Sequence, residues 1–432
     1  MEERWSTEHV LSLAPDAASR KAAGKLSSAA PWSGAGTDGT ALWGECAGSG
    51  RTPYRTVIEL ATPAYQCSCP SRKFPCKHAL GLLLLWSGSP EAVPAAEPAD
   101  WAAEWLKARE ERAEKRASAP VDPEAARRRA EKRGARVAAG AAELRLRLAD
   151  RVRHGLADQS TAGPWEEVAA RMVDAQAPGL ASRVRELDAL PQERMLEEYA
   201  MLHLLATAAV RVDELPAELA ATVRTRVGYP QDTAEVLAGP TVRDRWLVLG
   251  SRDTSDERLT TRRVWLRGAK TGRPALLLAF GRPGQAPDLA LPTGHLLEAE
   301  LGYHPGAHPL RAALGTRYGA PEPGPAAPPA GLTVAEAVAG YGTAVADDPW
   351  LESRPTVLTD VVPVRTPDGW YLTDGRHTVP VRTPAVPEAA LWRLAAVSTG
   401  RPLTVFGEYG HLGFAPVTAW PAGQRPVGLT HT

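Results

Sequence analysis

The pattern of apolar and polar positions changes character several times along the chain. Two short apolar-rich runs in residues 40–66, TALWGEC and YRTVIEL, flank the turn-forming stretch AGSGRTP and predict strands. The run ALGLLLLW in residues 79–86 then predicts a short helix. Residues 1–90, with a core at about 40–90, are therefore expected to form one small unit of strands and a helix.

Helical periodicity follows this unit. Residues 91–122 form a charged linker or helix, in which Trp101 and Trp105 share one helical face. Pro123 marks a helix start, and apolar positions recur at helical spacing as far as Val152. Further helices are predicted near residues 164–177, 179–190, 191–212 and 216–227, so residues 123–235 are expected to form a helical bundle.

Strand-like runs replace the helical pattern near residue 240. WLVLG, RRVWLRG, ALLLAF and TVLTDVVPV are rich in β-branched and aromatic residues, and Asp368-Gly369 is a turn signal. The stretch APEPGPAAPPAG at 320–331 is a Pro/Ala-rich linker between β-rich regions at 236–319 and 332–432. No repeat of fixed period is evident.

Composition restricts the class of protein. The 50 basic and 50 acidic side chains cancel, so the chain as a whole has no strong attraction for polyanions. The start MEERWSTEHV is unlike a secretory signal, and no apolar run approaches the roughly 18 residues that span a bilayer. We expect a cytoplasmic protein with no membrane partner. Abundant Ala, Gly, Pro and Arg are typical of a GC-rich bacterium.

The segment YQCSCPSRKFPCKH, residues 65–78, holds three of the four cysteines and one histidine. Cys67 and Cys69 are separated by one residue, so on a strand both sulfurs point to the same side. Cys76 and His78 repeat this spacing at the start of the expected helix. Thiolates and imidazole suit zinc, and four protein ligands complete a closed structural site. The sequence predicts one structural Zn²⁺.

Other interpretations of the cysteines compete with zinc. The ligands could be buried thiols beside a surface histidine, or a redox pair, although thioredoxin-type pairs have two intervening residues. Cys46, the remaining cysteine, is expected to be a small buried residue on a strand, with a spare ligand or reactive thiol as the alternative. A second metal at His304 and His308 is not expected, because Pro305 breaks a regular helix there.

The pattern C-x-C-x6-C-x-H resembles the SWIM zinc finger, and WGECAGSG (43–50) with Pro53-Tyr54 strengthens the resemblance to a bacterial group of SWIM proteins. The resemblance implies a ββα finger with the last two ligands at the helix start. The whole chain is then α+β: a small ββα zinc finger, a helical bundle and a β-rich C-terminal region. The ligands it implies are Cys67, Cys69, Cys76 and His78. In related bacteria such genes often lie beside MoxR-type AAA ATPases and von Willebrand A proteins, which implies a protein partner.

The ligand loop carries basic and aromatic residues. Arg72, Lys73, Phe74 and Lys77 are candidate contacts to a protein partner or to DNA or RNA. Alternatively, Phe74 fills the finger core and the cations stay solvated. Three hypotheses follow: a non-catalytic recognition or adaptor protein, a DNA- or RNA-binding protein, and an enzyme with an unrecognised site in 166–432. The sequence offers no catalytic residues for the third.

Overall fold

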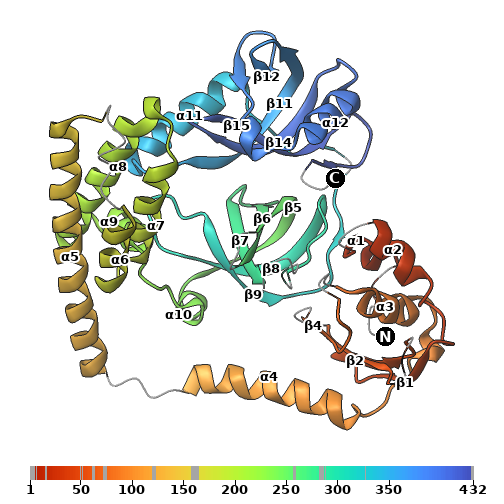
Figure 1. The fold of residues 1–432 in the computed structure, drawn as a ribbon. Coiled ribbons are helices and arrows are strands. Elements are labelled where there is room, and N and C mark those ends of the chain that lie inside the picture. Colours follow the sequence, from red (N-terminus) through yellow and green to blue (C-terminus); the bar gives the residue numbers. More distant parts are fainter. Residues whose placement is uncertain are drawn as a thin grey trace.

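The computed structural model shows four units, of which three are arranged around a central β-barrel (Figure 1). The chain runs from the N-terminal unit along two long helices to a helical bundle, and then enters the central barrel and a second barrel. None of the described helices is both long and apolar enough to cross a membrane. The structure describes all residues except 1–4, 6, 15–16, 49, 51, 61–63, 72–74, 119–122, 157–164, 256–258, 282–286, 288, 326 and 430–432.

The N-terminal unit is an antiparallel sheet covered by helices on both faces. Alternate strand residues point to opposite faces. Leu42 and Ile58 pack on α3, while Trp43 and Val57 pack on the Trp101 side of α4. The expected ββα unit is present as β3, β4 and α3, with two further strands beside it. The elements are α1 (Thr7–Ser12), α2 (Ala17–Gly24), β1 (Trp32–Thr37), β2 (Ala41–Cys46), β3 (Tyr54–Glu59), β4 (Ala64–Cys67), α3 (Lys77–Gly88) and α4 (Asp100–Ser118).

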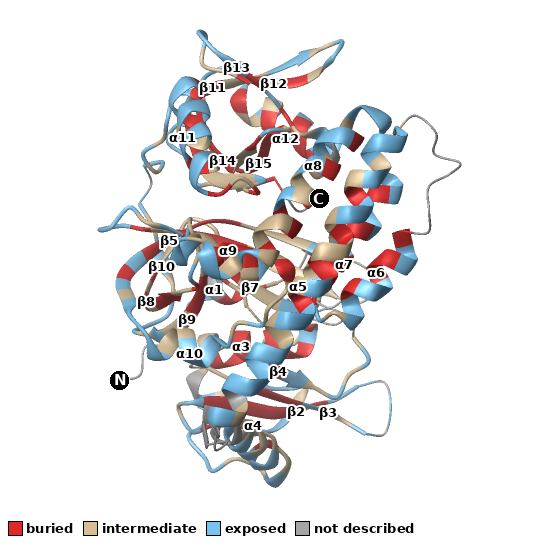
Figure 2. Cartoon of the chain, turned by 90° about the vertical axis from the view of Figure 1, so that its left-hand side faces the viewer, coloured by how far each residue is buried: buried red, intermediate tan, exposed pale blue. Residues whose placement is uncertain are grey.

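The helical bundle forms where the apolar periodicity predicted it. Its buried residues, among them Leu144, Leu180, Tyr199 and Val223, come from α5 to α9 and form one core. Figure 2 shows the buried positions turned inward and the exposed positions on the outer side. The helices are α5 (Pro123–His154), α6 (Trp165–Asp174), α7 (Pro178–Glu186), α8 (Gln192–Val210) and α9 (Ala217–Val227), followed by the short α10 (Thr233–Ala238).

The central β region closes into a barrel. Its strands pair in the order β8-β5-β6-β7-β9, and β9 pairs again with β8; only the β7–β9 pairing is parallel. This is the strand order of the OB fold. The strands are β5 (Thr241–Ser255), β6 (Thr260–Gly268), β7 (Pro274–Gly281), β8 (His295–Tyr303), β9 (Arg311–Arg317) and the short β10 (Glu322–Pro323), which pairs with β8 from within the Pro-rich stretch.

The C-terminal region repeats this topology. β11 pairs with β12 and β14, β12 pairs with β13, and β14 pairs with β15. A parallel bridge between Val381 and Phe414 joins the end of β13 to β15, again as in the OB fold. Two helices here lacked a prediction: α11, whose Thr333 and Glu336 form a capping box, and α12. The elements are α11 (Val334–Asp347), β11 (Ser353–Thr366), β12 (Gly369–Thr373), β13 (Thr378–Pro380), α12 (Glu388–Ser398), β14 (Leu403–Gly410), β15 (Gly413–Trp420) and β16 (Val427–Gly428).

Candidate zinc site

Four side chains converge where β4 ends and α3 begins. Cys67 is the last residue of β4, and Cys76 is the N-cap of α3, with His78 in the first turn. The candidate ligand atoms of Cys67, Cys69, Cys76 and His78 all lie within 4.8 Å of one another. Two ligand pairs from two different elements therefore meet at one point, as their spacing predicted.

The geometry fits a zinc ion. The Sγ atom of Cys67 lies 3.6 Å from Nδ1 of His78. Zn–S bonds of about 2.3 Å and Zn–N bonds of about 2.0 Å in a tetrahedron place these atoms about 3.5 Å apart. Three sulfurs and one imidazole nitrogen are also the donors of closed structural zinc sites. The group is thus positioned to bind one zinc ion, with His78 as an Nδ1 ligand.

Neighbouring groups orient the ligands. The hydroxyl of Thr56 donates a 3.2 Å hydrogen bond to the Sγ atom of Cys67, and the backbone N–H of Ala79 donates one of 3.5 Å to the Sγ atom of Cys76. The ring of Tyr54 lies against His78, with centroids 4.7 Å apart. Hydrogen bonds to sulfur favour the thiolate, and packing fixes the ring, so these neighbours stabilise the binding geometry. The sequence pattern indicated Tyr54 only as part of a motif and indicated no role for Thr56.

Hydrogen bonds among the three thiols shift the pKa values of Cys69 and Cys76 in opposite directions. Hydrogen bonds from Cys67 and then Cys76 hold the pKa of Cys69 far below its usual range. Hydrogen bonds to Cys67 and Cys69, followed by burial, hold the pKa of Cys76 far above it. A zinc ion that takes all three as thiolates must therefore displace protons, so its affinity falls as pH is lowered.

The other candidate ligands lie outside this group. Cys46 is buried on β2, as expected, and burial raises the pKa of its thiol. Its Sγ atom contacts the carbonyl oxygen of Ala47 at 3.7 Å. His304 is buried in the central barrel, which is the first of the two barrels along the chain, and burial lowers its pKa. His308 pairs with Asp347 at 3.2 Å.

The ligand loop borders a hollow of about 390 Å³. Its lining includes Tyr54, Cys69 and Lys77 from the finger and Ser19 from α2, and Lys77 is exposed. Lys77 therefore lies at the surface beside the zinc site. The other predicted contacts, Arg72, Lys73 and Phe74, lie outside the described residues.

A closed Cys₃His group between a strand and a helix start defines a small zinc-binding module. Residues 54–86 match the family model of the SWIM zinc finger, and residues 132–227 match that of the SWIM-associated four-helix bundle domain. The chain therefore carries a SWIM zinc finger followed by its associated bundle. Searches of curated proteins and of solved structures find no match to this chain.

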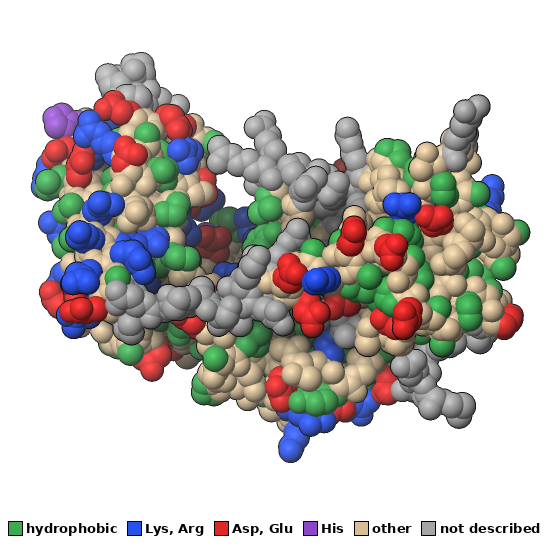
Figure 3. Space-filling view, turned by 90° about the horizontal axis from the view of Figure 1, so that it is seen from below, with side chains coloured by type: hydrophobic (Ala, Val, Ile, Leu, Met, Phe, Trp, Pro, Cys, Tyr) green, Lys and Arg blue, Asp and Glu red, His purple; other side chains and the backbone are tan. Residues whose placement is uncertain are grey.

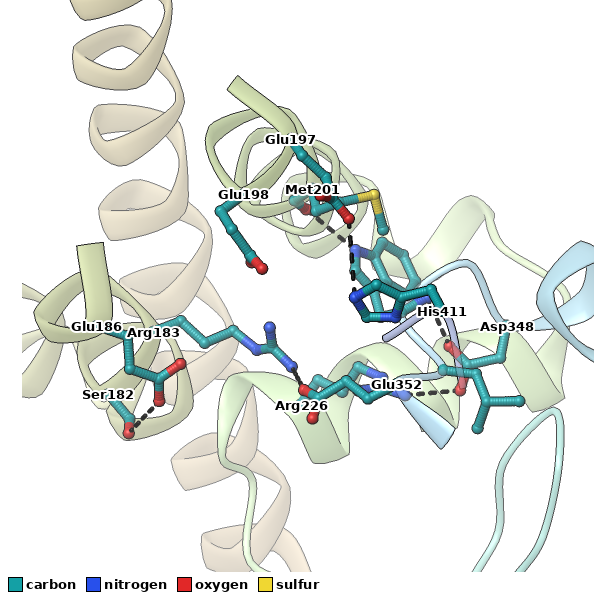
Figure 4. Close-up of polar contacts among 12 residues, drawn as sticks. Ser182, Arg183, Glu186, Glu197, Glu198, Met201, Arg226, Asp348, Glu352 and His411 are labelled. Atoms are coloured by element: carbon teal, nitrogen blue, oxygen red, sulfur yellow. Dashed lines mark hydrogen bonds and ion pairs between the residues drawn. The ribbon is translucent and has the colours of Figure 1, made fainter. Parts of the chain in front are cut away.

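A second concave feature lies between the bundle and the second barrel. This cleft of about 500 Å³ is lined by α7, α8 and residues 349–352, together with Arg382 and the turn at His411. Ion pairs between these units include Arg183–Glu352 at 2.5 Å, Arg226–Asp348 at 2.8 Å and His411–Glu197 at 3.8 Å (Figure 4). An enzyme site in 166–432 would need convergent polar groups, and here most of the charged groups pair with one another. The enzyme alternative stays a hypothesis.

Proposed function

We propose that this chain is a non-catalytic recognition protein in which the SWIM finger docks a protein partner and the zinc ion serves folding. The observation that carries the proposal is the closed ligand set of Cys67, Cys69, Cys76 and His78. A catalytic zinc site keeps one position open for water or substrate, whereas four protein ligands fill the coordination sphere.

The surroundings of the finger support its ligand end as the docking surface. Both faces of its sheet are covered, one by α3 and the other by α4. The hollow beside Lys77 and Tyr54 lies at the end of the finger that holds the zinc ligands. Binding of a partner at this end would therefore depend on whether the four ligands hold a zinc ion.

The charges near the finger favour a protein over a nucleic acid. Arg55 pairs with Glu45 at 3.0 Å, and Arg109 pairs with Glu59 at 3.0 Å. On α5, basic residues of the run at 127–133 form i,i+4 pairs with glutamates. Basic and acidic side chains are interspersed over the face seen from below (Figure 3). Paired cations have less charge to offer to phosphates.

The partner that we propose is an AAA ATPase of the MoxR type or a von Willebrand A protein, as the family resemblance implies. Biolayer interferometry with a purified MoxR-type ATPase from the same organism tests this proposal. We expect binding by the zinc-loaded chain, a loss of at least tenfold with Lys77→Glu, and no binding by Cys76→Ser. Cys46→Ser is the matched control and should bind normally. Equal binding by Cys76→Ser and the parent chain would exclude the finger as the docking module.

A further inference from the structure

The first, central barrel has an outer face, formed by β6 and β7, that carries basic and aromatic side chains. In OB folds the second and third strands form the face that binds oligonucleotides or oligosaccharides, and here these strands are β6 and β7. Fold alone does not establish function, so the argument depends on the residues of this face.

Residue alternation identifies the outward positions. Val264, Leu266 and Leu277 fill the barrel interior, so Arg263, Trp265 and the even-numbered residues of β7 point outward. One end of this outer face is covered, because Trp265 and Leu276 pack against the second barrel. The other end is more open. There Arg263 pairs across the strands with Leu278, and Thr261 pairs with Phe280, whose side chain is 53% exposed.

Two arginines lie opposite each other beside this open end. Arg252 lies opposite Arg263 on β5 and contacts Glu408 of the second barrel at 3.4 Å. The pKa of Arg252 is lowered, first by burial and then by the nearby guanidinium groups of Arg263 and Arg382, although Glu408 opposes these effects. Within the described part of the chain, no carboxylate lies within ion-pair distance of Arg263 or Arg382.

Arg252 therefore has Glu408 as its carboxylate partner, whereas Arg263 has none among the described residues. An excess of buried or half-buried positive charge is stabilised by an anion. The exposed ring of Phe280 lies two residues along β7 from Leu278, the partner of Arg263, which is about 7 Å on a strand. An anion contact and an aromatic surface are therefore close enough to meet the phosphate and base of one strand.

We propose that the open end of the β6–β7 face binds single-stranded nucleic acid, with a base stacked on Phe280 and a backbone phosphate held by Arg263. Arg252, which lies opposite Arg263 on β5, adds positive charge beside it. Stacking on an aromatic ring beside basic groups is the general mode of sequence-tolerant single-strand binding. This site is separate from the zinc finger and does not depend on the finger's partner.

Fluorescence anisotropy with short labelled oligo(dT) and oligo(rU) tests the proposal, with salt titrated in each series. Phe280→Ala should weaken binding about tenfold, because it removes the ring on which one base stacks. Arg263→Ala should weaken binding and lower the salt slope by about one unit, while Arg263→Lys should keep most of the affinity. Duplex DNA of the same length should bind more weakly, since its bases are not free to stack.

Matched variants separate this site from its alternatives. Tyr318→Ala removes an aromatic residue that is 41% exposed just beyond β9 of the same barrel, and it should leave affinity unchanged. Lys77→Ala tests the finger loop, and it too should have no effect. Thermal melts should show that all variants keep the fold. The proposal fails if the zinc-loaded chain binds no oligonucleotide at low salt. It also fails if only Lys77→Ala weakens binding, or if Phe280→Ala has no effect.

Discussion

The indole N–H of Trp350 donates a 3.1 Å hydrogen bond to the backbone carbonyl of Met201, 149 residues earlier in the chain. Trp350 is 5% exposed and belongs to the core of the helical bundle, although it lies just before the first strand of the second barrel. The second barrel is therefore held to the bundle by a buried aromatic side chain as well as by ion pairs.

Replacing Trp350 with alanine should release this anchor. We expect a cost of about 3–5 kcal/mol to the stability of the bundle, because a large buried side chain leaves a cavity. Chemical unfolding followed by circular dichroism measures this cost, and limited proteolysis should show faster cleavage between α11 and β11. The matched control is Trp392→Ala, since Trp392 is 55% exposed. Equal destabilisation by the two variants would show that Trp350 is not an anchor.

The zinc ion should depend on Cys76 and be independent of Cys46. Cys76 caps α3 and belongs to the ligand group, whereas Cys46 lies outside it. Cys76→Ser should abolish stoichiometric zinc and unfold the finger, because structural zinc supplies on the order of 10 kcal/mol to such modules. Elemental analysis and far-UV circular dichroism of both variants measure this effect. Zinc retained at the parental level in Cys76→Ser would contradict the ligand set.

Gly81 should be needed for the close approach of the N-terminal segment to α3. A Cβ atom at this position would lie 2.6 Å from the Cβ atom of Leu26. Gly81→Ala should cost about 1–3 kcal/mol through overpacking. Gly88→Ala in the same helix is the control, because nothing lies within 4 Å of its added Cβ atom. Thermal unfolding of the zinc-loaded variants should show a lower midpoint for Gly81→Ala alone; matching midpoints would show that the N-terminal segment can shift at no cost.

Asp244 should make the stability of the first barrel depend on pH. Its carboxylate accepts hydrogen bonds from the hydroxyl and backbone N–H of Thr271, at 2.7 and 2.9 Å, and from the backbone N–H groups of Arg245 and Lys270. Burial raises the pKa of Asp244, but these bonds outweigh burial and lower it below its usual value. The ionised form is therefore favoured by folding.

A lowered folded-state pKa gives stability that is present above the unfolded-state pKa, about 3.9 for aspartate, and is lost as pH falls through the folded value. Asp244→Asn should destabilise the protein by about 1–3 kcal/mol at neutral pH. The difference from the parent chain should shrink below about pH 4, which denaturant titrations across pH can follow. Asp174→Asn, at an exposed position on α6, is the matched control and should change the free energy of unfolding by less than about 0.5 kcal/mol. A difference that does not change with pH would contradict the role of the Asp244 charge.

Local patterns predicted the elements close to the zinc site. The one-residue spacing of Cys67 and Cys69, and of Cys76 and His78, was enough to identify the ligand group. Trp101 and Trp105 do pack on one face of α4. The helices α11 and α12 lacked a prediction because β-like runs surround them, although Thr333 and Glu336 carried a capping-box signal.

The zinc chemistry, the helical bundle and the change to strands near residue 240 follow from the amino-acid sequence, because they depend on spacing and periodicity within short segments. The closure of the β regions into two barrels of the same strand order depends instead on tertiary packing, since strand pairing joins residues far apart in the chain. Tertiary packing also brings Trp350 into the bundle and brings Glu408 of the second barrel against Arg252 of the first. No local pattern encodes such contacts, because they arise only when separate units pack against each other.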